Sequence, residues 1–244
     1  MSRLGQFVGV GVGPGPAGFI PLAAVEALRQ ADTIFLPRAR SSQASVARQC
    51  LAGLELPEDR FEETEFTMDP DRNVLNAHYA RLAARVMEHL RAGKNVAYVT
   101  IGDSLTYSTY AYLLAALLDL APQLEHRTFP GVTSFAAAAA AMSWPLGEGK
   151  ERILVLPCPD DLESLRADIL SHDIVVLMKI ANRLPGVLAL LREMDILARC
   201  AFARHIGLPG ELLCADLTTL QPEESNGYLS TMLIRRNPRV RGHS

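Results

Sequence analysis

The sequence has few of the residues that build metal sites and disulfide frameworks. Only four of its 244 residues are cysteines, and no two of them form a CxxC pair. Neither a zinc site nor a disulfide framework is therefore indicated, and we expect reduced thiols in a cytoplasmic protein. The six histidines have no metal-ligand spacing, so each is expected on the surface or packed against a helix. No metal site is predicted.

Long apolar runs and a strong excess of charge are also missing. No stretch reaches the roughly 18 apolar residues of a membrane span. Glycines and Pro14 end the N-terminal apolar run too early for a secretory signal. The formal net charge of −3 gives no sign of a nucleic-acid-binding surface. Since 49% of the residues are apolar, the chain can still build a substantial core.

Strands and helices alternate along the first half of the chain. Short β-branched runs bounded by glycine or proline predict the strands, and helical spacing of apolar residues predicts the helices. The strands lie at 7–13, 33–38 and 95–101, and the helices at 19–31, 76–93 and 111–121. The 40s are also expected to be helical, whereas 55–73 is acidic and expected to be irregular. This alternation is typical of a parallel sheet with helices on its faces.

The second half repeats the alternation with a different pattern. Strands are predicted at 124–131, 152–158, 173–180, 199–206 and 227–236, and helices at 134–142, 160–171 and 185–197. The last strand alternates less strictly, which favours an antiparallel position at an edge. We therefore predict two α/β lobes, residues 1–130 and 131–244, and expect a ligand in the cleft between them.

The stretch GPGPAG at 13–18 matches the GxGxxG pattern of Rossmann dinucleotide-binding proteins. Pro14 and Pro16 remove two of the backbone N–H groups that would hold a pyrophosphate. The next predicted strand ends in Pro37 and Arg38, with no acidic residue for a ribose. A nicotinamide or flavin cofactor is therefore disfavoured, and no GxxxxGK[ST] phosphate loop occurs.

The residues Gly102-Asp103-Ser104-Leu105 spell the GDSL block of a class of serine esterases. In those enzymes the block follows the first strand, and a DxxH pair near the C-terminus supplies the base. Here it follows a third predicted strand, and no such pair occurs. Because a serine needs an adjacent base to become a nucleophile at neutral pH, the esterase interpretation is disfavoured. Ser104 is expected to shape the turn and to lend it a hydrogen bond.

Five segments in a fixed order carry a stronger signal. They are VGVGPG (10–15), TIGDSLTYSTY (100–110), FPGVTSFAAAAA (129–140), PLGEGKERILVLP (145–157) and VVLMK (175–179). The series resembles the tetrapyrrole methylase family, and the resemblance spans about residues 5 to 236. The GDSLTYSTY, PLGEGKE and VLMKI versions are similar to the branch that methylates carbon 20 of precorrin-2 or its cobalt-bearing counterpart. Methylation of another carbon of a uroporphyrinogen or precorrin is the nearest alternative.

The resemblance implies two α/β lobes that are not Rossmann folds, with S-adenosylmethionine bent in the cleft between them. The positions that match its binding residues are Pro14, Ile101, Gly102, Asp103, Thr106, Thr133, Ser134, Met178 and Ile206. Taken alone, the Gly102-Asp103 pair could be a turn, the Ser/Thr cluster a set of helix caps, and Pro14-Gly15 a turn that ends the strand. The family also implies a small-molecule tetrapyrrole substrate and a homodimer, with no nucleic acid or membrane as partner.

Carbon methylation at a sulfonium needs positioning and exclusion of water more than strong acids. Asp103 and Tyr107 are the candidate catalytic residues. The acetate and propionate groups of a tetrapyrrole call for cationic side chains. Arg38, Arg40 and Lys179 are therefore the candidate substrate-binding residues.

Overall fold

The computed structural model describes residues 4–40, 44–220 and 227–239. It divides the chain into two units, Met1–Thr133 and Ser134–Ser244, each with its own sheet and apolar core. The α/β class expected from the alternation of strands and helices is confirmed. Within the described part of the chain, no helix combines the length and the apolar character needed to cross a membrane.

The first unit is built on a parallel five-stranded sheet with the order β3-β2-β4-β1-β5. Its strands are β1 (Phe7–Gly11), β2 (Thr33–Ala39), β3 (Phe61–Phe66), β4 (Val96–Thr100) and β5 (His126–Phe129). The central strands β1 and β4 are buried along their whole length, which explains their nearly continuous apolar sequences.

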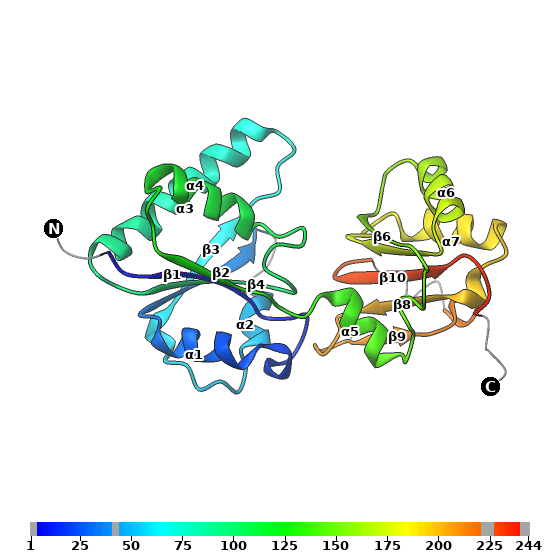
Figure 1. Cartoon of the computed structure of the whole chain (residues 1–244), viewed down its shortest axis with the longest axis horizontal. Helices are drawn as coiled ribbons and strands as arrows, with labels where there is room; N and C mark the ends of the chain where they lie inside the picture. Colours follow the sequence, from blue (N-terminus) through cyan, green and yellow to red (C-terminus); the bar gives the residue numbers. More distant parts are fainter. Residues whose placement is uncertain (1–3, 41–43, 221–226, 240–244) are drawn as a thin grey trace. The chain divides into compact units, whose positions relative to one another are not determined.

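Helices cover both faces of this sheet. In Figure 1, α1 (Leu22–Gln30) and α2 (Val46–Cys50) lie on one side, and α3 (Arg72–Arg91) and α4 (Tyr110–Leu120) on the other. Two short 3₁₀ turns, η1 (Ala17–Phe19) and η2 (Glu58–Arg60), complete the unit. Asp71 caps α3 by accepting a hydrogen bond from the N–H of Asn73. The helix ends where predicted, just before Gly93 with φ +79°.

The segment 55–73, expected to be irregular, contains the strand β3. Its sequence FEETEF carries three carboxylates, which hid the strand pattern. These carboxylates are paired on the neighbouring elements: Glu62 with Arg85, and both Glu63 and Glu65 with Arg38. Because β3 is an edge strand, its charges also oppose pairing with another chain.

The second unit has a mixed five-stranded sheet with the order β6-β7-β10-β8-β9. Its strands are β6 (Ile153–Pro157), β7 (Ile174–Met178), β8 (Cys200–Arg204), β9 (Leu212–Cys214) and β10 (Ser230–Arg235). The last strand is antiparallel, but it lies at the centre of the sheet, so its expected edge position is wrong. Every residue of β10 is buried, and burial of both faces removes the alternation that marks a half-exposed strand.

Helices also cover both faces of the second sheet. α6 (Leu162–Ser171) and α7 (Leu184–Glu193) lie on one side, and α5 (Ser134–Ala141) on the other (Figure 1). The alanines of α5 allow the helix to pack closely along β10, and Ala137 and Ala138 are buried there. Two 3₁₀ turns, η3 (Leu197–Arg199) and η4 (Leu217–Thr219), flank β8 and β9.

Candidate functional site

The carboxyl ends of the five parallel strands share one edge of the first sheet. At its centre, the neighbouring strands β1 and β4 lead to helices on opposite faces, β1 to α1 and β4 to α4 (Figure 1). The two loops therefore diverge at this point, which is where open α/β sheets bind their ligands. Three predicted motifs follow β1, β4 and β5 and so meet at this edge.

Close backbone contacts at glycines hold these three loops together. Gly13 and Gly102 form an isolated antiparallel bridge, with N–H···O distances of 3.1 and 2.8 Å. A Cβ atom on Gly131 would lie 2.1 Å from the carbonyl oxygen of Gly102, and one on Gly11 would lie 2.6 Å from the nitrogen of Gly131. Only glycine fits at these two contacts. Pro14, directly after the bridge, is buried.

Gly102 itself has φ +72°, a conformation that favours glycine. Apart from its two neighbours in the chain, no described residue has an atom within 4 Å of the position that its Cβ would occupy. The backbone of the Ile101-Gly102-Asp103 turn therefore has open space beside it, as close approach of a ligand requires. This geometry fits the predicted cofactor contact.

The carboxylate of Asp103 joins the loop after β4 to the loop after β5. Its Oδ1 accepts hydrogen bonds from the N–H groups of Leu105 (3.0 Å) and Thr106 (2.9 Å) and from the Thr106 hydroxyl (2.8 Å). Its Oδ2 accepts one from the N–H of Gly131 (3.1 Å). A carboxylate has about four acceptor positions, two on each oxygen, so Oδ2 retains acceptor capacity for a ligand.

The same hydrogen bonds set the ionisation of Asp103. Partial burial by itself would raise its pKa. The bonds from the Thr106 hydroxyl and from the N–H groups of Leu105, Gly131 and Thr106 outweigh burial and lower the pKa below its usual value. Asp103 is therefore an anion at neutral pH, suited to attract a cation and poorly suited to take up a proton.

The hydroxyl groups of TIGDSLTYSTY are mostly directed into the unit. Ser104 is buried, and its hydroxyl donates to the backbone carbonyl oxygen of Phe129. Ser108 lies 3.1 Å from the hydroxyl of Thr100, and Thr109 lies 3.4 Å from that of Tyr98. The hydroxyl of Ser104 is thus a structural donor. Tyr107, in contrast, is 44% exposed and has φ +53°.

The two candidate arginines lie at the end of β2. Arg38 is within 3.3 Å of Glu63 and of Glu65 on β3, so its charge is already partly compensated. Arg40 is exposed. Both share the carboxyl edge of the sheet with Asp103, and Arg40 has the freer position for a substrate carboxylate.

A second group of predicted residues meets at one edge of the second sheet. β7 and β8 flank β10, which is antiparallel to both, so their carboxyl ends lie at the same edge. Thr231 of β10 is paired with both Met178 and Ala203, and its hydroxyl lies 2.8 Å from that of Ser134. Ile206, just beyond the end of β8, is 5% exposed. The structure therefore brings Ser134, Met178 and Ile206 to one edge.

The backbone at this edge has an unusual conformation. Lys179, Ala181, His205 and Leu229 all have φ between +48° and +54°. Ala181 and Gly227 form an isolated bridge, and the N–H of His205 donates to the carbonyl of Leu229 (3.1 Å). Left-handed backbone at non-glycine residues is uncommon and gathers at functional sites. Desolvation lowers the pKa of Lys179, although its side chain remains partly exposed.

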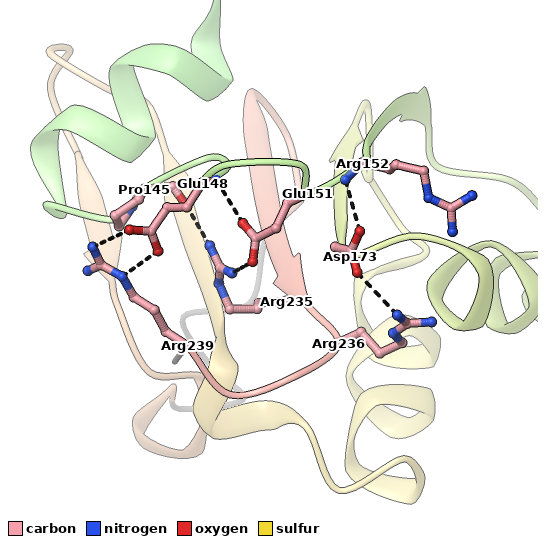
Figure 2. Close-up of polar contacts among 8 residues, drawn as sticks. All are labelled: Pro145, Glu148, Glu151, Arg152, Asp173, Arg235, Arg236 and Arg239. Carbon is pink, nitrogen blue, oxygen red and sulfur yellow. Dashed lines mark hydrogen bonds and ion pairs between the residues drawn. The ribbon is translucent and has the colours of Figure 1, made fainter. Parts of the chain in front are cut away.

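The PLGEGKE loop lies at the opposite edge of this sheet and is tied to β10 (Figure 2). Arg235, with a side chain only 7% exposed, pairs with Glu151 and donates to the carbonyl oxygen of Pro145 (3.0 Å). Its guanidinium lies 5.3 Å from the centre of the Trp144 ring. Arg239 binds Glu148 through two nitrogens, at 2.6 and 2.8 Å.

A second link at this edge joins β6, β7 and β10. Asp173 accepts from the N–H of Arg152 (2.9 Å) and from the side chain of Arg236 (3.1 Å) (Figure 2). These contacts all lie at the start of β6 and β7 and at the end of β10. PLGEGKE, one of the three motifs that indicated this branch in the sequence, therefore stabilises the second unit and lies away from the edge that carries Met178.

The predicted residues thus form one group in each unit. Pro14, Ile101, Gly102, Asp103, Thr106 and Thr133 lie in the loops of the first unit, and Ser134, Met178, Lys179 and Ile206 at the carboxyl edge of the second. The predictions omitted Gly11 and Gly131, although both stand in motifs that had been recognised. They also left His205 among the surface or helix-packing histidines. A single histidine without a spacing partner gives no sequence signal.

Comparison with known proteins identifies the family of this chain. The profile of the Tetrapyrrole (Corrin/Porphyrin) Methylases matches residues 6–221. The cobalt-precorrin-2 C(20)-methyltransferase of Salmonella typhimurium is 28% identical over 95% of this chain and 97% of its own. The probable cobalt-precorrin-2 C(20)-methyltransferase of Methanocaldococcus jannaschii is 30% identical, over 97% of this chain and 99% of its own.

Solved structures share the fold. A cobalt precorrin-4 methyltransferase superposes with a TM-score of 0.72 at 18% identity, covering 96% of each chain. The uroporphyrin-III C-methyltransferase of Thermus thermophilus, crystallised with S-adenosylhomocysteine, gives a TM-score of 0.61 at 17% identity, covering 95% of this chain and 97% of its own. With a profile match over most of its length and a full-length relative at 30% identity, this chain belongs to the tetrapyrrole (corrin/porphyrin) methylases.

Proposed function

We propose that the protein transfers a methyl group from S-adenosylmethionine to carbon 20 of precorrin-2, or of its cobalt-bearing counterpart, in cobalamin biosynthesis. The observation that carries the proposal is the full-length similarity to two cobalt-precorrin-2 C(20)-methyltransferases. The thermophilic relative crystallised with S-adenosylhomocysteine supports the choice of cofactor. Ser104 is buried and its hydroxyl is bonded to a backbone carbonyl, and the relatives are methyltransferases, so the esterase alternative has no support.

The residues of the two groups fit the chemistry of this cofactor. When bound, S-adenosylmethionine supplies a methyl group on a positively charged sulfur. We assign the open backbone at Gly102 and the hydroxyls of Thr106 and Thr133 to its ribose and carboxylate. Asp103 keeps acceptor capacity on Oδ2 for a cationic group. Met178 and Ile206 offer apolar surface and backbone groups to the adenine.

Catalysis by these residues is mainly a matter of positioning. The glycine contacts and the Asp103 carboxylate fix three loops of the first unit in one arrangement. A site that is already ordered lowers the entropic cost of orienting the cofactor and the substrate for methyl transfer. Pro14 in the first unit and Ile206 in the second are buried apolar residues, and each excludes water from the predicted cofactor contacts beside it. We assign to Tyr107, which is 44% exposed, a contact with the cationic macrocycle.

We assign the acidic side chains of the substrate to Lys179 and Arg40, with Arg38 in a weaker role because Glu63 and Glu65 already pair with it. Because members of the family are commonly homodimers, we further propose that the protein is a homodimer in the cytoplasm. The four cysteines are buried and unpaired, as a reducing compartment would leave them. Light scattering of the purified protein tests the oligomeric state.

Thermal denaturation with S-adenosylhomocysteine tests the cofactor assignment. At a ligand concentration of 100 times Kd, the melting temperature should rise by roughly 5–10 °C, because a bound ligand stabilises the folded state. An unchanged melting temperature at millimolar ligand would refute the assignment. Mass spectrometry and NMR of the product from precorrin-2, with and without cobalt, then identify the methylated carbon. Methylation at a carbon other than carbon 20 would assign the protein to a different methylation reaction of the family.

A further inference from the structure

Methylation of a ring carbon leaves a step that neither candidate catalytic residue serves well. The electron pair of the new C–C bond comes from the macrocycle, which becomes a cation and must lose a proton. Asp103 accepts four hydrogen bonds and has a lowered pKa, so it is a weak base. A tyrosine hydroxyl has an ordinary pKa of about 10, which does not match proton removal near neutral pH. Efficient proton removal needs a group whose ordinary pKa is near 7, which points to histidine.

His205 is the one histidine that the described residues place beside the predicted cofactor contacts. It follows β8 directly and precedes Ile206. Thr231 pairs with Ala203, two residues before His205, and with Met178 on the other side. Since adjacent strands lie about 4.8 Å apart, the backbones of Met178 and Ala203 are roughly 10 Å apart. His205 is half-buried at the carboxyl edge where both strands end.

The ring of His205 is held in one orientation and one tautomer. Its Nδ1 lies 3.3 Å from the carbonyl oxygen of Pro209, which can only accept, so Nδ1 carries the proton. The neutral ring therefore has its free electron pair on Nε2. Among the described residues, no atom forms a hydrogen bond with Nε2. The ring also stands edge-on to Tyr228, with centroids 6.2 Å apart.

The backbone around His205 reinforces this orientation. Its N–H donates to the carbonyl of Leu229 (3.1 Å), and its carbonyl accepts from the N–H of Leu208 (2.8 Å). The N–H of Gly207 donates to Glu211 (2.7 Å), which closes the loop that carries Pro209. With φ +51°, His205 is fixed in a left-handed conformation at the strand end.

We propose that His205 is the base that removes the proton from the methylated macrocycle, an inference that rests on the proposed methyltransferase function. Nε2 forms a bond to the proton, the C–H electron pair returns to the ring system, and the positive charge moves from the macrocycle to the imidazole. The imidazolium then releases the proton to water, and Nδ1 keeps its bond to Pro209 throughout. No further reactant is needed.

Two variants and a matched control test this role. His205→Ala should lower kcat with precorrin-2 about 100-fold, while the thermal shift with S-adenosylhomocysteine stays at the wild-type value. Added imidazole should restore much of the rate, since it replaces the missing base. His205→Gln has a side chain of similar size that is not basic, and it should show the same loss of kcat. This variant provides the test if His205→Ala does not fold.

His172→Gln is the control. Its Nδ1 also lies near a carbonyl oxygen four residues away, that of Asp168 (3.0 Å), but His172 stands at the amino end of β7. It should leave kcat unchanged. Wild-type kcat in His205→Gln would overturn the proposal, and so would a loss of kcat that imidazole does not restore and that parallels a loss of ligand binding. If the wild-type protein neither binds S-adenosylhomocysteine nor methylates precorrin-2, the methyltransferase function itself fails.

Discussion

Asp103 shows how one side chain can organise a site without taking part in bond formation. Its Oδ1 holds the turn of its own loop through Leu105 and Thr106, while its Oδ2 reaches the N–H of Gly131 in another loop. An asparagine could keep the first set of bonds through its oxygen. It would turn an NH₂ group toward the N–H of Gly131, and two donors cannot bond to each other.

Asp103→Asn should therefore weaken S-adenosylhomocysteine binding. Loss of a hydrogen bond to a charged acceptor costs about 1.5–3 kcal/mol, which corresponds to a Kd roughly 10- to 100-fold higher. Isothermal titration calorimetry measures the Kd of S-adenosylhomocysteine for both proteins. Asp119→Asn, an exposed carboxylate on α4 of the same unit, is the control and should bind as wild type.

The pH dependence of the same binding has a definite sign. The pKa of Asp103 is lowered in the folded protein, so its stabilising bonds persist above the ordinary value of about 3.9 and are lost only as the pH falls through the lowered value. This contribution should thus be constant from pH 5 to pH 8. If Asp103→Asn closed its gap to wild type near pH 6, the pKa of the carboxylate would be raised, and the assigned direction would be wrong.

A helix or strand can be predicted from its own residues, whereas the position of a strand in a sheet depends on residues far away in the chain. The helix α3 has a clear helical periodicity and ends near Gly93, and the strand β4 is a short continuous apolar run, so both elements were predictable. The central position of β10 was not, because it depends on pairing with β7 and β8, which lie far away in the chain. Of the motif glycines, only Gly102 was predicted to be at the site, because the contacts of Gly11 and Gly131 arise only when the three loops come together.

The contact between Arg235 and the PLGEGKE loop should affect stability and leave binding unchanged. Glu151→Gln removes the charged partner of a buried guanidinium, which should cost about 1–3 kcal/mol in urea denaturation. The Kd for S-adenosylhomocysteine should not change, because the pair lies at the opposite edge from Met178. Glu148→Gln, in an exposed pair, is the control and should unfold like wild type. A weaker Kd in Glu151→Gln without a loss of stability would assign the loop to the site.

For the whole molecule, the proposed cofactor-binding residues come from both units, Asp103 and Thr106 from the first and Met178 and Ile206 from the second. Each unit has its own core and could open on its own. A ligand held by residues of both should stabilise both, whereas a ligand held by one would leave the other as it was. The two alternatives are separable by a probe buried in each unit.

Cysteines provide these probes. Cys50 in the first unit and Cys200 in the second are fully buried, and burial raises their pKa values to about 11 and about 12. At pH 8 both thiols are protonated and shielded, so iodoacetamide should react only when a unit opens. S-adenosylhomocysteine at 100 times Kd should slow both reactions about 100-fold, as followed by peptide mass spectrometry. Protection of Cys50 alone would confine the cofactor to the loops around Asp103, and protection of Cys200 alone would confine it to the edge that carries Met178.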